Sequence, residues 1–238
     1  MVLSAAGNIE HGDLVRHAEA LFQGLNPGEP SAAIPAKYVG GSRLSVKPFE
    51  QAHVVLGFEG ISFRDPAFYP AQVFSGLFGG GMSSRLFQEI REKRGLCYSI
   101  YSSAWGLGDT GLMSVHAATG SDMIGELVDV VRHELHVMTE DLASERELQR
   151  SKAQLKTGLL MSLESSVGRA EQMARQVLAF DRLLPADELI ERVENVSREA
   201  VRETVQRLVS GTTPCIALVG AGRSATSIAK RAMERLGA

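Results

Sequence analysis

The chain has 238 residues and a net charge of −3, with 44% apolar and 22% charged residues, which is the composition of a globular protein. Its 25 basic and 28 acidic residues leave no basic surplus, so we expect no nucleic-acid partner. No apolar run approaches the roughly 20 residues that a membrane span needs, and no signal-peptide pattern precedes Arg16. We therefore expect a cytoplasmic protein without membrane contact. Cys97 and Cys215 fit neither a metal clip nor a disulfide framework, which predicts two free, mostly buried thiols.

The two halves of the chain differ in composition. Residues 1–119 hold 16 of the 24 glycines, whereas residues 120–238 hold 34 of the charged side chains. Because glycine permits turns and charges cover the solvated faces of helices, the first half should form sheet and loops. Short apolar runs bounded by turn residues predict strands at 42–47, 54–58, 99–105, 112–118 and 216–219.

The second half shows the apolar spacing of successive amphipathic helices. One stripe runs from Ile124 to Leu142, and Ser144 with Glu147 forms a capping box that begins the next helix. Together with the early strands, this predicts an α+β fold: an antiparallel-rich mixed sheet with helices packed on one face, as a two-layer sandwich. Further helices are predicted over 167–178, from Pro185, and after the cap Ser197.

The two ends of the chain are similar to each other. Residues 2–8 read VLSAAGN and residues 215–220 read CIALVG; each small apolar strand ends at a glycine and is followed by an amphipathic helix. The two glycines lie 213 residues apart, a period that matches a whole domain rather than a solenoid repeat. We interpret residues 1–25 as the last strand–helix unit of a preceding copy, 26–39 as a linker and 40–238 as a C-terminal subdomain. The alternative is a chance likeness between two strand–helix units.

The segment FGGGMSSRLFQEIREKRGLCY carries the densest candidate chemistry. Gly79, Gly80 and Gly81 run into a helix that Ser83 or Ser84 should cap, and free backbone N–H groups at a helix start can hold an anion or a carbonyl oxygen. The segment contains neither GxxxxGK[ST] nor GxGxxG, which excludes a P-loop and a dinucleotide fingerprint. A tight corner between two helices is the alternative interpretation.

Arg91 and Tyr98 flank Gly95 in the same segment. Gly95 should stop the helix, so that Tyr98 begins the next strand and both side chains reach one side of the sheet edge. A guanidinium and a phenol aimed at one point can hold a peptide carbonyl or an oxyanion. The alternative is an Arg–Tyr contact that only packs the surface.

The sequence offers no zinc ligand set, since H-E-x-x-H and H-x-x-E-H are both absent. His133 and His136 are only three residues apart, on the solvated face of a predicted helix. His53 and His116 are isolated strand residues. No Ser–His–Asp arrangement can be argued, and no histidine is nominated as a partner for Cys97. We therefore predict no catalytic residue and no bound metal in this chain.

The runs GGGMSSRLFQEIREKRGLCYSIYSS and GDTGLMSVHAATG resemble the second, inactive subdomain of the insulysin/pitrilysin (inverzincin) zinc metallopeptidases. The mitochondrial-processing-peptidase-like branch, in its bacterial form, is the most similar. The resemblance extends from about residue 40 to the end, and residues 2–25 are similar to the tail of the first subdomain. It implies half-molecules built from two similar α/β subdomains. It also implies that zinc is a cofactor of the missing N-terminal subdomain, held there by H-x-x-E-H and a downstream Glu.

The resemblance also implies roles for residues of this chain. Arg91 and Tyr98 would reach the substrate at the zinc site, and Gly79, Gly80 and Gly81 would take part in substrate handling. The glycine stretch is short for the family, which argues against strong presequence recognition. The chain would then be the C-terminal substrate-binding half of a zinc metalloendopeptidase, inactive alone.

The partners that the resemblance implies are a peptide substrate and a zinc-bearing subdomain. That subdomain would lie in the same chain or in a partner subunit of a homodimer or heterodimer. The alternative is a non-catalytic scaffold or partner subunit of a processing-peptidase-like heterodimer, similar to a respiratory-complex core protein. The discriminating observation is whether H-x-x-E-H stands upstream in the parent protein.

Overall fold

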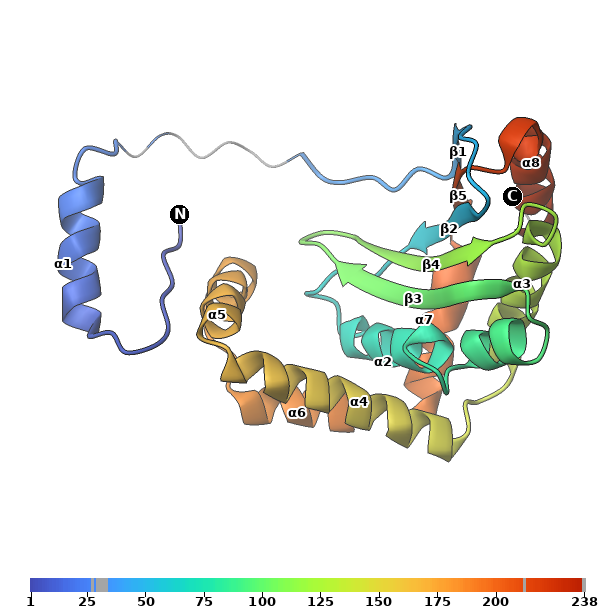
Figure 1. Cartoon of the computed structure of the whole chain (residues 1–238). Helices are drawn as coiled ribbons and strands as arrows, with labels where there is room; N and C mark the ends of the chain where they lie inside the picture. Colours follow the sequence, from blue (N-terminus) through green and yellow to red (C-terminus); the bar gives the residue numbers. More distant parts are fainter. Residues whose placement is uncertain (27, 29–33, 212, 237–238) are drawn as a thin grey trace.

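A computed structural model describes residues 1–26, 28, 34–211 and 213–236. Five strands form one mixed sheet in the order β1-β5-β2-β4-β3 (Figure 1). β1 runs parallel to β5, and the other neighbouring strands are antiparallel, which confirms the predicted antiparallel-rich sheet. The strands are β1 (Gly41–Ser45), β2 (Ala52–Glu59), β3 (Cys97–Gly106), β4 (Gly111–Thr119) and β5 (Cys215–Val219).

The helices follow the predicted order and pack mainly against one face of the sheet. Figure 1 shows α2, α3 and α7 on the same side of the strands, with α8 beside β1 and β5. Among the described residues, no helix combines the length and the apolar character needed to cross a bilayer. The helices are α1 (His11–Phe22), α2 (Phe68–Gly79), η1 (Phe87–Glu92), α3 (Ile124–Glu140), α4 (Glu145–Glu164), α5 (Ser166–Phe180), α6 (Ala186–Glu194), α7 (Arg198–Ser210), η2 (Gly222–Ser224) and α8 (Ala225–Leu236).

The helix α2 lies at the centre of the core, between β3 and α4. Phe74 and Phe78 are fully buried and their rings stack with 5.0 Å between centroids. Two buried hydroxyls bind its backbone: Ser102 Oγ of β3 donates to the Ser75 carbonyl and Ser151 Oγ of α4 to the Val73 carbonyl, each at 2.7 Å. Sequence periodicity did not predict α2, because a helix that is buried on nearly every side has no polar face and hence no stripe.

The N-terminal segment departs from the predicted strand–helix unit. Residues 1–6 form no strand, although α1 forms as expected. A strand requires a neighbour that satisfies its backbone groups, and none of the five strands pairs with this segment. No residue of α1 is buried, and Figure 1 shows this helix apart from the sheet. Residues 27 and 29–33 of the predicted linker lie outside the described residues.

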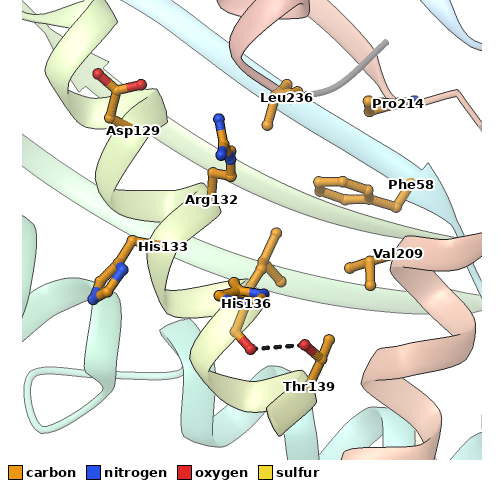
Figure 2. Close-up of a pocket in the computed structure, with 10 residues that line it drawn as sticks. Phe58, Asp129, Arg132, His133, His136, Thr139, Val209, Pro214 and Leu236 are labelled. Carbon is orange, nitrogen blue, oxygen red and sulfur yellow. Dashed lines mark hydrogen bonds between the residues drawn. The ribbon is translucent and has the colours of Figure 1, made fainter.

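The outer side of α3 borders a hollow of about 510 Å³, which Phe58, Arg132 and Leu236 help to line (Figure 2). His133 and His136 also border it and are exposed, as their place on the solvated face predicts. Within the described part of the chain, no group of three His, Cys, Asp or Glu side chains is arranged to hold a metal ion. The two described cysteines are free, with Cys97 buried.

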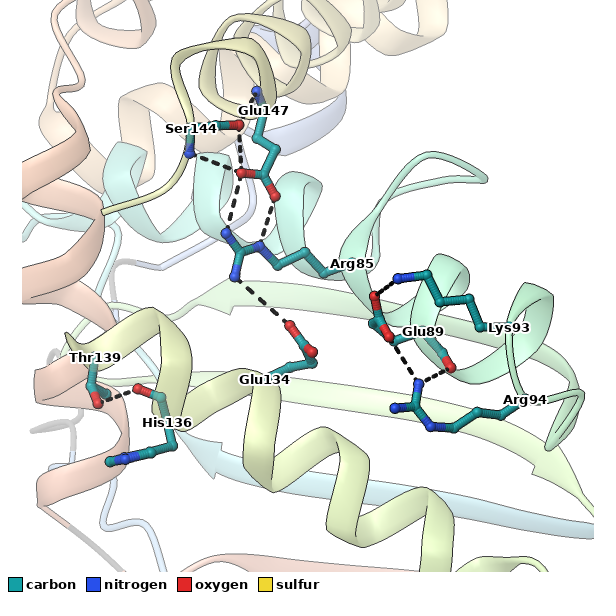
Figure 3. A network of polar contacts seen from close by, with 9 residues as sticks. All are labelled: Arg85, Glu89, Lys93, Arg94, Glu134, His136, Thr139, Ser144 and Glu147. Atoms are coloured by element: carbon teal, nitrogen blue, oxygen red, sulfur yellow. Dashed lines mark hydrogen bonds and ion pairs between the residues drawn. The ribbon is translucent and has the colours of Figure 1, made fainter. Parts of the chain in front are cut away.

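A polar network ties the segment after α2 to α3 and α4 (Figure 3). The Arg85 guanidinium donates two hydrogen bonds to Glu147, at 2.7 and 3.2 Å, and lies 3.7 Å from a Glu134 oxygen. Glu147 also accepts hydrogen bonds from the backbone and hydroxyl of Ser144, which confirms the predicted capping box. Burial raises the pKa of Glu134. Burial would also raise the pKa of Glu147, but the bonds from Arg85 and Ser144 outweigh it and lower this pKa to about 2.

We expect Glu147→Gln to destabilise the protein by about 1–3 kcal/mol at pH 7, because it weakens a charge-assisted contact with Arg85. In the unfolded chain the carboxyl titrates near 4.3. Its stabilising contribution is therefore complete above that pH and is lost as the pH falls toward about 2. The variant should thus show a flatter acid dependence of the unfolding free energy over that range, measured by chemical denaturation. Glu145→Gln, on the first turn of the same helix and exposed, is the control; identical acid profiles for both variants would contradict the assignment.

Candidate functional site

The glycine-rich turn links α2 to η1, and its three glycines are not equivalent. A Cβ on Gly79 would lie 2.5 Å from the backbone nitrogen of Ser102 in β3, and a Cβ on Gly80 would lie 2.6 Å from a carbonyl oxygen of its own helix. Packing therefore requires both glycines, as the tight-corner alternative predicts. Gly81 is exposed and has no such restriction, since the nearest atom to its Cβ position is 3.7 Å away on a flexible side chain.

The predicted cap at Ser83 or Ser84 is wrong. The hydroxyl of Ser84 donates to the Gly81 carbonyl at 2.6 Å instead of accepting a bond from the helix. The backbone N–H of Ser84 donates to the same carbonyl at 2.9 Å, so both donors of this residue are directed back toward Gly81. The helix that follows is also of the π type: the Lys93 N–H donates to the carbonyl of Gln88, five residues earlier, at 3.0 Å. Single π turns are frequent at functional sites.

Gly95 ends η1, as predicted, in a left-handed conformation with φ of 64°. Its N–H donates to the Arg91 carbonyl, and the next N–H reaches the Ile90 carbonyl. The chain then enters β3 through a bulge between Cys97 and Ser99. The bulge separates the two side chains at the start of the strand, so that Cys97 is buried whereas Tyr98 is 73% exposed.

Arg91 and Tyr98 come together on the surface as the sequence predicts. The guanidinium carbon of Arg91 lies 4.6 Å from the ring centroid of Phe87 and 5.8 Å from that of Tyr98. The guanidinium thus makes cation–π contacts with both rings. Within the described residues, neither side chain has a hydrogen-bond or ion-pair partner, so their polar hydrogens are available to a ligand. Burial raises the pKa of the Cys97 thiol against the effect of Arg91, which disfavours a thiolate nucleophile here.

The strand β3 presents further aromatic side chains that the sequence analysis did not single out. Tyr101 and Trp105 are 51% and 69% exposed, and Tyr101 stacks on His116 of β4 with 4.6 Å between ring centroids. Burial lowers the pKa of His116, which keeps this ring neutral at pH 7. β3 is an edge strand, and a free edge beside aromatic side chains can accept an extended peptide. Strand alternation placed Tyr101 and Trp105 on one face, but only the tertiary structure shows that this face is open.

The sequence and the fold are both similar to known proteins. The profile of the family described as Peptidase M16 inactive domain matches residues 1–155. An uncharacterized zinc protease of Rickettsia felis is 37% identical over 214 residues, which cover 90% of this chain and 52% of the relative. The zinc protease YmxG of Bacillus subtilis, also uncharacterized, is 30% identical over 209 residues, 87% of this chain and 51% of the relative. The chain thus spans about half the length of the curated relatives it matches.

Two solved structures share the fold. A peptidase M16 inactive domain from Pseudomonas fluorescens superposes with a TM-score of 0.77 and 21% identity, over 90% of this chain and 52% of the other. A chain of complex III from Candida albicans gives a TM-score of 0.82 and 20% identity, over 97% and 57%. The structural likeness shows the fold, while the family profile and the relatives show descent. The resemblance to the insulysin/pitrilysin metallopeptidases is therefore confirmed, and the chain belongs to the peptidase M16 family as an inactive domain.

Proposed function

We propose that this chain is the substrate-binding half of a zinc metalloendopeptidase, and that Arg91 and Tyr98 hold the peptide substrate. The observation that carries the proposal is the exposed pair itself. Two side chains with free donors meet at the start of an edge strand, on a domain whose relatives are named zinc proteases. A surface contact with only a packing role does not need unused donors on both partners.

The pair acts on the peptide through hydrogen bonds. The Arg91 guanidinium lies over the Phe87 ring, 4.6 Å from its centroid, and this contact restricts where its N–H groups can point before the ligand arrives. The bulge at the start of β3 turns the Tyr98 side chain to the surface, where its ring lies beside Arg91. Together they can donate to the oxygen of a peptide carbonyl and stabilise negative charge that develops on it.

We place the zinc of the complete enzyme in the preceding subdomain, of which residues 1–25 are the proposed last unit. The described residues of this chain do not fit the metal, because they offer no group of three ligands. The matched relatives are about twice as long as this chain, which leaves room for a second subdomain of similar size. We therefore assign the residues of this chain to binding the peptide and not to binding the metal.

A non-catalytic scaffold or partner subunit is the second candidate. The likeness to a chain of complex III indicates that the fold also occurs in a subunit of a multi-protein complex. In a scaffold, Arg91 and Tyr98 would have no ligand and could be replaced at no functional cost. The experiments below separate the two candidates.

The chain alone should bind no stoichiometric zinc and should cleave no peptide, because both need ligands from the preceding subdomain. Metal analysis after zinc dialysis, together with a fluorogenic peptide assay, tests this expectation. A complete relative that carries both subdomains is the positive control. One chelator-sensitive zinc per chain, with peptidase activity, would overturn the proposed division of roles.

In the complete enzyme, Arg91→Ala and Tyr98→Phe should each lower kcat/KM by roughly a hundredfold, the usual effect of removing one oxyanion-type donor. Zinc content and thermal stability should stay the same, because both side chains are exposed or half-buried. Arg91→Lys should restore only part of the activity, since an ammonium lacks the planar fork.

Arg94→Ala is the matched control for the pair. Arg94 lies on the same turn but donates to Glu89 instead of facing a ligand. It should retain wild-type turnover. If Arg91→Ala and Tyr98→Phe retain it as well, the pair only packs the surface and the scaffold alternative stands.

The glycines of the turn give a separate test. Gly79→Ala should destabilise the protein by about 1–3 kcal/mol through overpacking, since its Cβ meets the backbone of β3. Gly81→Ala should leave the melting temperature unchanged but raise KM for peptides if the substrate approaches the turn closely. Differential scanning calorimetry and steady-state kinetics distinguish these effects. Wild-type kinetics for Gly81→Ala would remove the turn from the substrate site.

A further inference from the structure

The glycine-rich turn is held through its carbonyl groups. Four successive carbonyls, those of residues 80–83, each accept a hydrogen bond from a side chain. Such complete satisfaction is unusual for an exposed turn, where water normally serves as the partner. The four bonds run from Gln154 Nε2 to Gly80 O at 2.5 Å, from Ser84 Oγ to Gly81 O at 2.6 Å, from Gln88 Nε2 to Met82 O at 2.7 Å and from Arg150 Nη2 to Ser83 O at 2.5 Å.

Two of these donors, Arg150 and Gln154, come from α4 and are four residues apart, so they share one face of that helix. Glu147 lies one turn earlier on the same helix and binds Arg85, which directly follows the turn. One face of α4 therefore contacts both the turn and Arg85, the residue that follows it. α4 is also the helix whose Ser151 hydroxyl binds the backbone of α2, so it fixes the segments on both sides of the turn.

The donor side of the turn is left free. Within the described part of the chain, the N–H groups of Gly81, Met82 and Ser83 have no protein acceptor, and all three residues are exposed. Apolar packing does little to hold the turn, since the Met82 side chain is 73% exposed. Its shape therefore depends on the hydrogen bonds to its carbonyls, which leave the N–H groups for a ligand.

We propose that Arg150 and Gln154 are positioning residues for the substrate-binding turn: they hold its carbonyls so that its N–H groups stay available to the peptide. They contact the turn and not the substrate. This role rests on the proposed function and on an approach of the peptide to Gly81, which the Gly81→Ala variant tests separately. It assigns a positioning task to α4, for which the sequence predicts only a capping box and the spacing of an amphipathic helix.

The test uses the double variant Arg150→Met/Gln154→Met in the complete enzyme. Methionine keeps most of the length of both side chains and removes the donors. We expect KM for peptides to rise about tenfold, because a mobile turn binds the same ligand less well, while kcat, zinc content and melting temperature stay near wild type. Order parameters of the Gly80 and Gly81 amides, from ¹⁵N-glycine-labelled protein, should fall. The variant Arg150→Lys/Gln154→Met, which keeps a cationic donor at position 150, should recover part of the loss in KM.

Arg146→Met is the matched control on the same helix. Arg146 is exposed and binds no part of the turn, so its variant should retain wild-type KM and order parameters. Unchanged order parameters, or an unchanged KM beside a defective Arg91→Ala enzyme, would overturn the positioning role alone. If Arg91→Ala, Tyr98→Phe and the double variant all retain wild-type kinetics, the proposed function fails and the positioning role fails with it.

Discussion

The arrangement of the site depends on how closely α2 approaches β3 on one side and α4 on the other. Gly79 allows the first contact, since a Cβ there would meet the backbone of β3, and Gly76 allows the second, since its Cβ would lie 2.5 Å from the Ser151 hydroxyl. The Ser102 and Ser151 hydroxyls then donate hydrogen bonds to carbonyls of α2. At these two contacts, small side chains bring hydrogen bonds to positions that larger apolar side chains would otherwise fill. This contact fixes the end of α2, and with it the start of the turn that leads to Arg91.

From that fixed point, two local irregularities bring Arg91 to Tyr98. The π turn of η1 changes the direction in which its last residues point, and the left-handed Gly95 reverses the chain into β3. The bulge then exposes Tyr98 while Cys97 stays in the core. Each of these three features departs from regular helix or strand geometry. Their common result is that Arg91 and Tyr98 meet at the surface, an arrangement that supports the proposed substrate role.

Sequence reasoning predicted the parts of this protein that follow a period. The five strands, the stripe of α3, the capping box of α4 and the cap at Ser197 all rest on local pattern, and the structure shows each of them. The same patterns do not reveal α2, which is buried on nearly every side, and the predicted cap at Ser83 or Ser84 fails because the Ser84 hydroxyl donates to the Gly81 carbonyl. The likeness of residues 2–8 to residues 215–220 also predicts a strand in the N-terminal segment. The likeness in sequence did not give a strand where no sheet adjoins it.

The three glycines of the turn show why a motif must be resolved residue by residue before it supports a function. Gly79 and Gly80 are explained by packing alone, so their presence would be expected in an enzyme and in a scaffold with the same fold. Gly81 is not explained by packing, and neither are the free donors of Arg91 and Tyr98 or the four side chains that bind the turn's carbonyls. A scaffold needs a stable turn but has no use for unpaired N–H groups on that turn or for unused donors on Arg91 and Tyr98. The features that packing does not explain therefore favour a peptide-binding half of an enzyme.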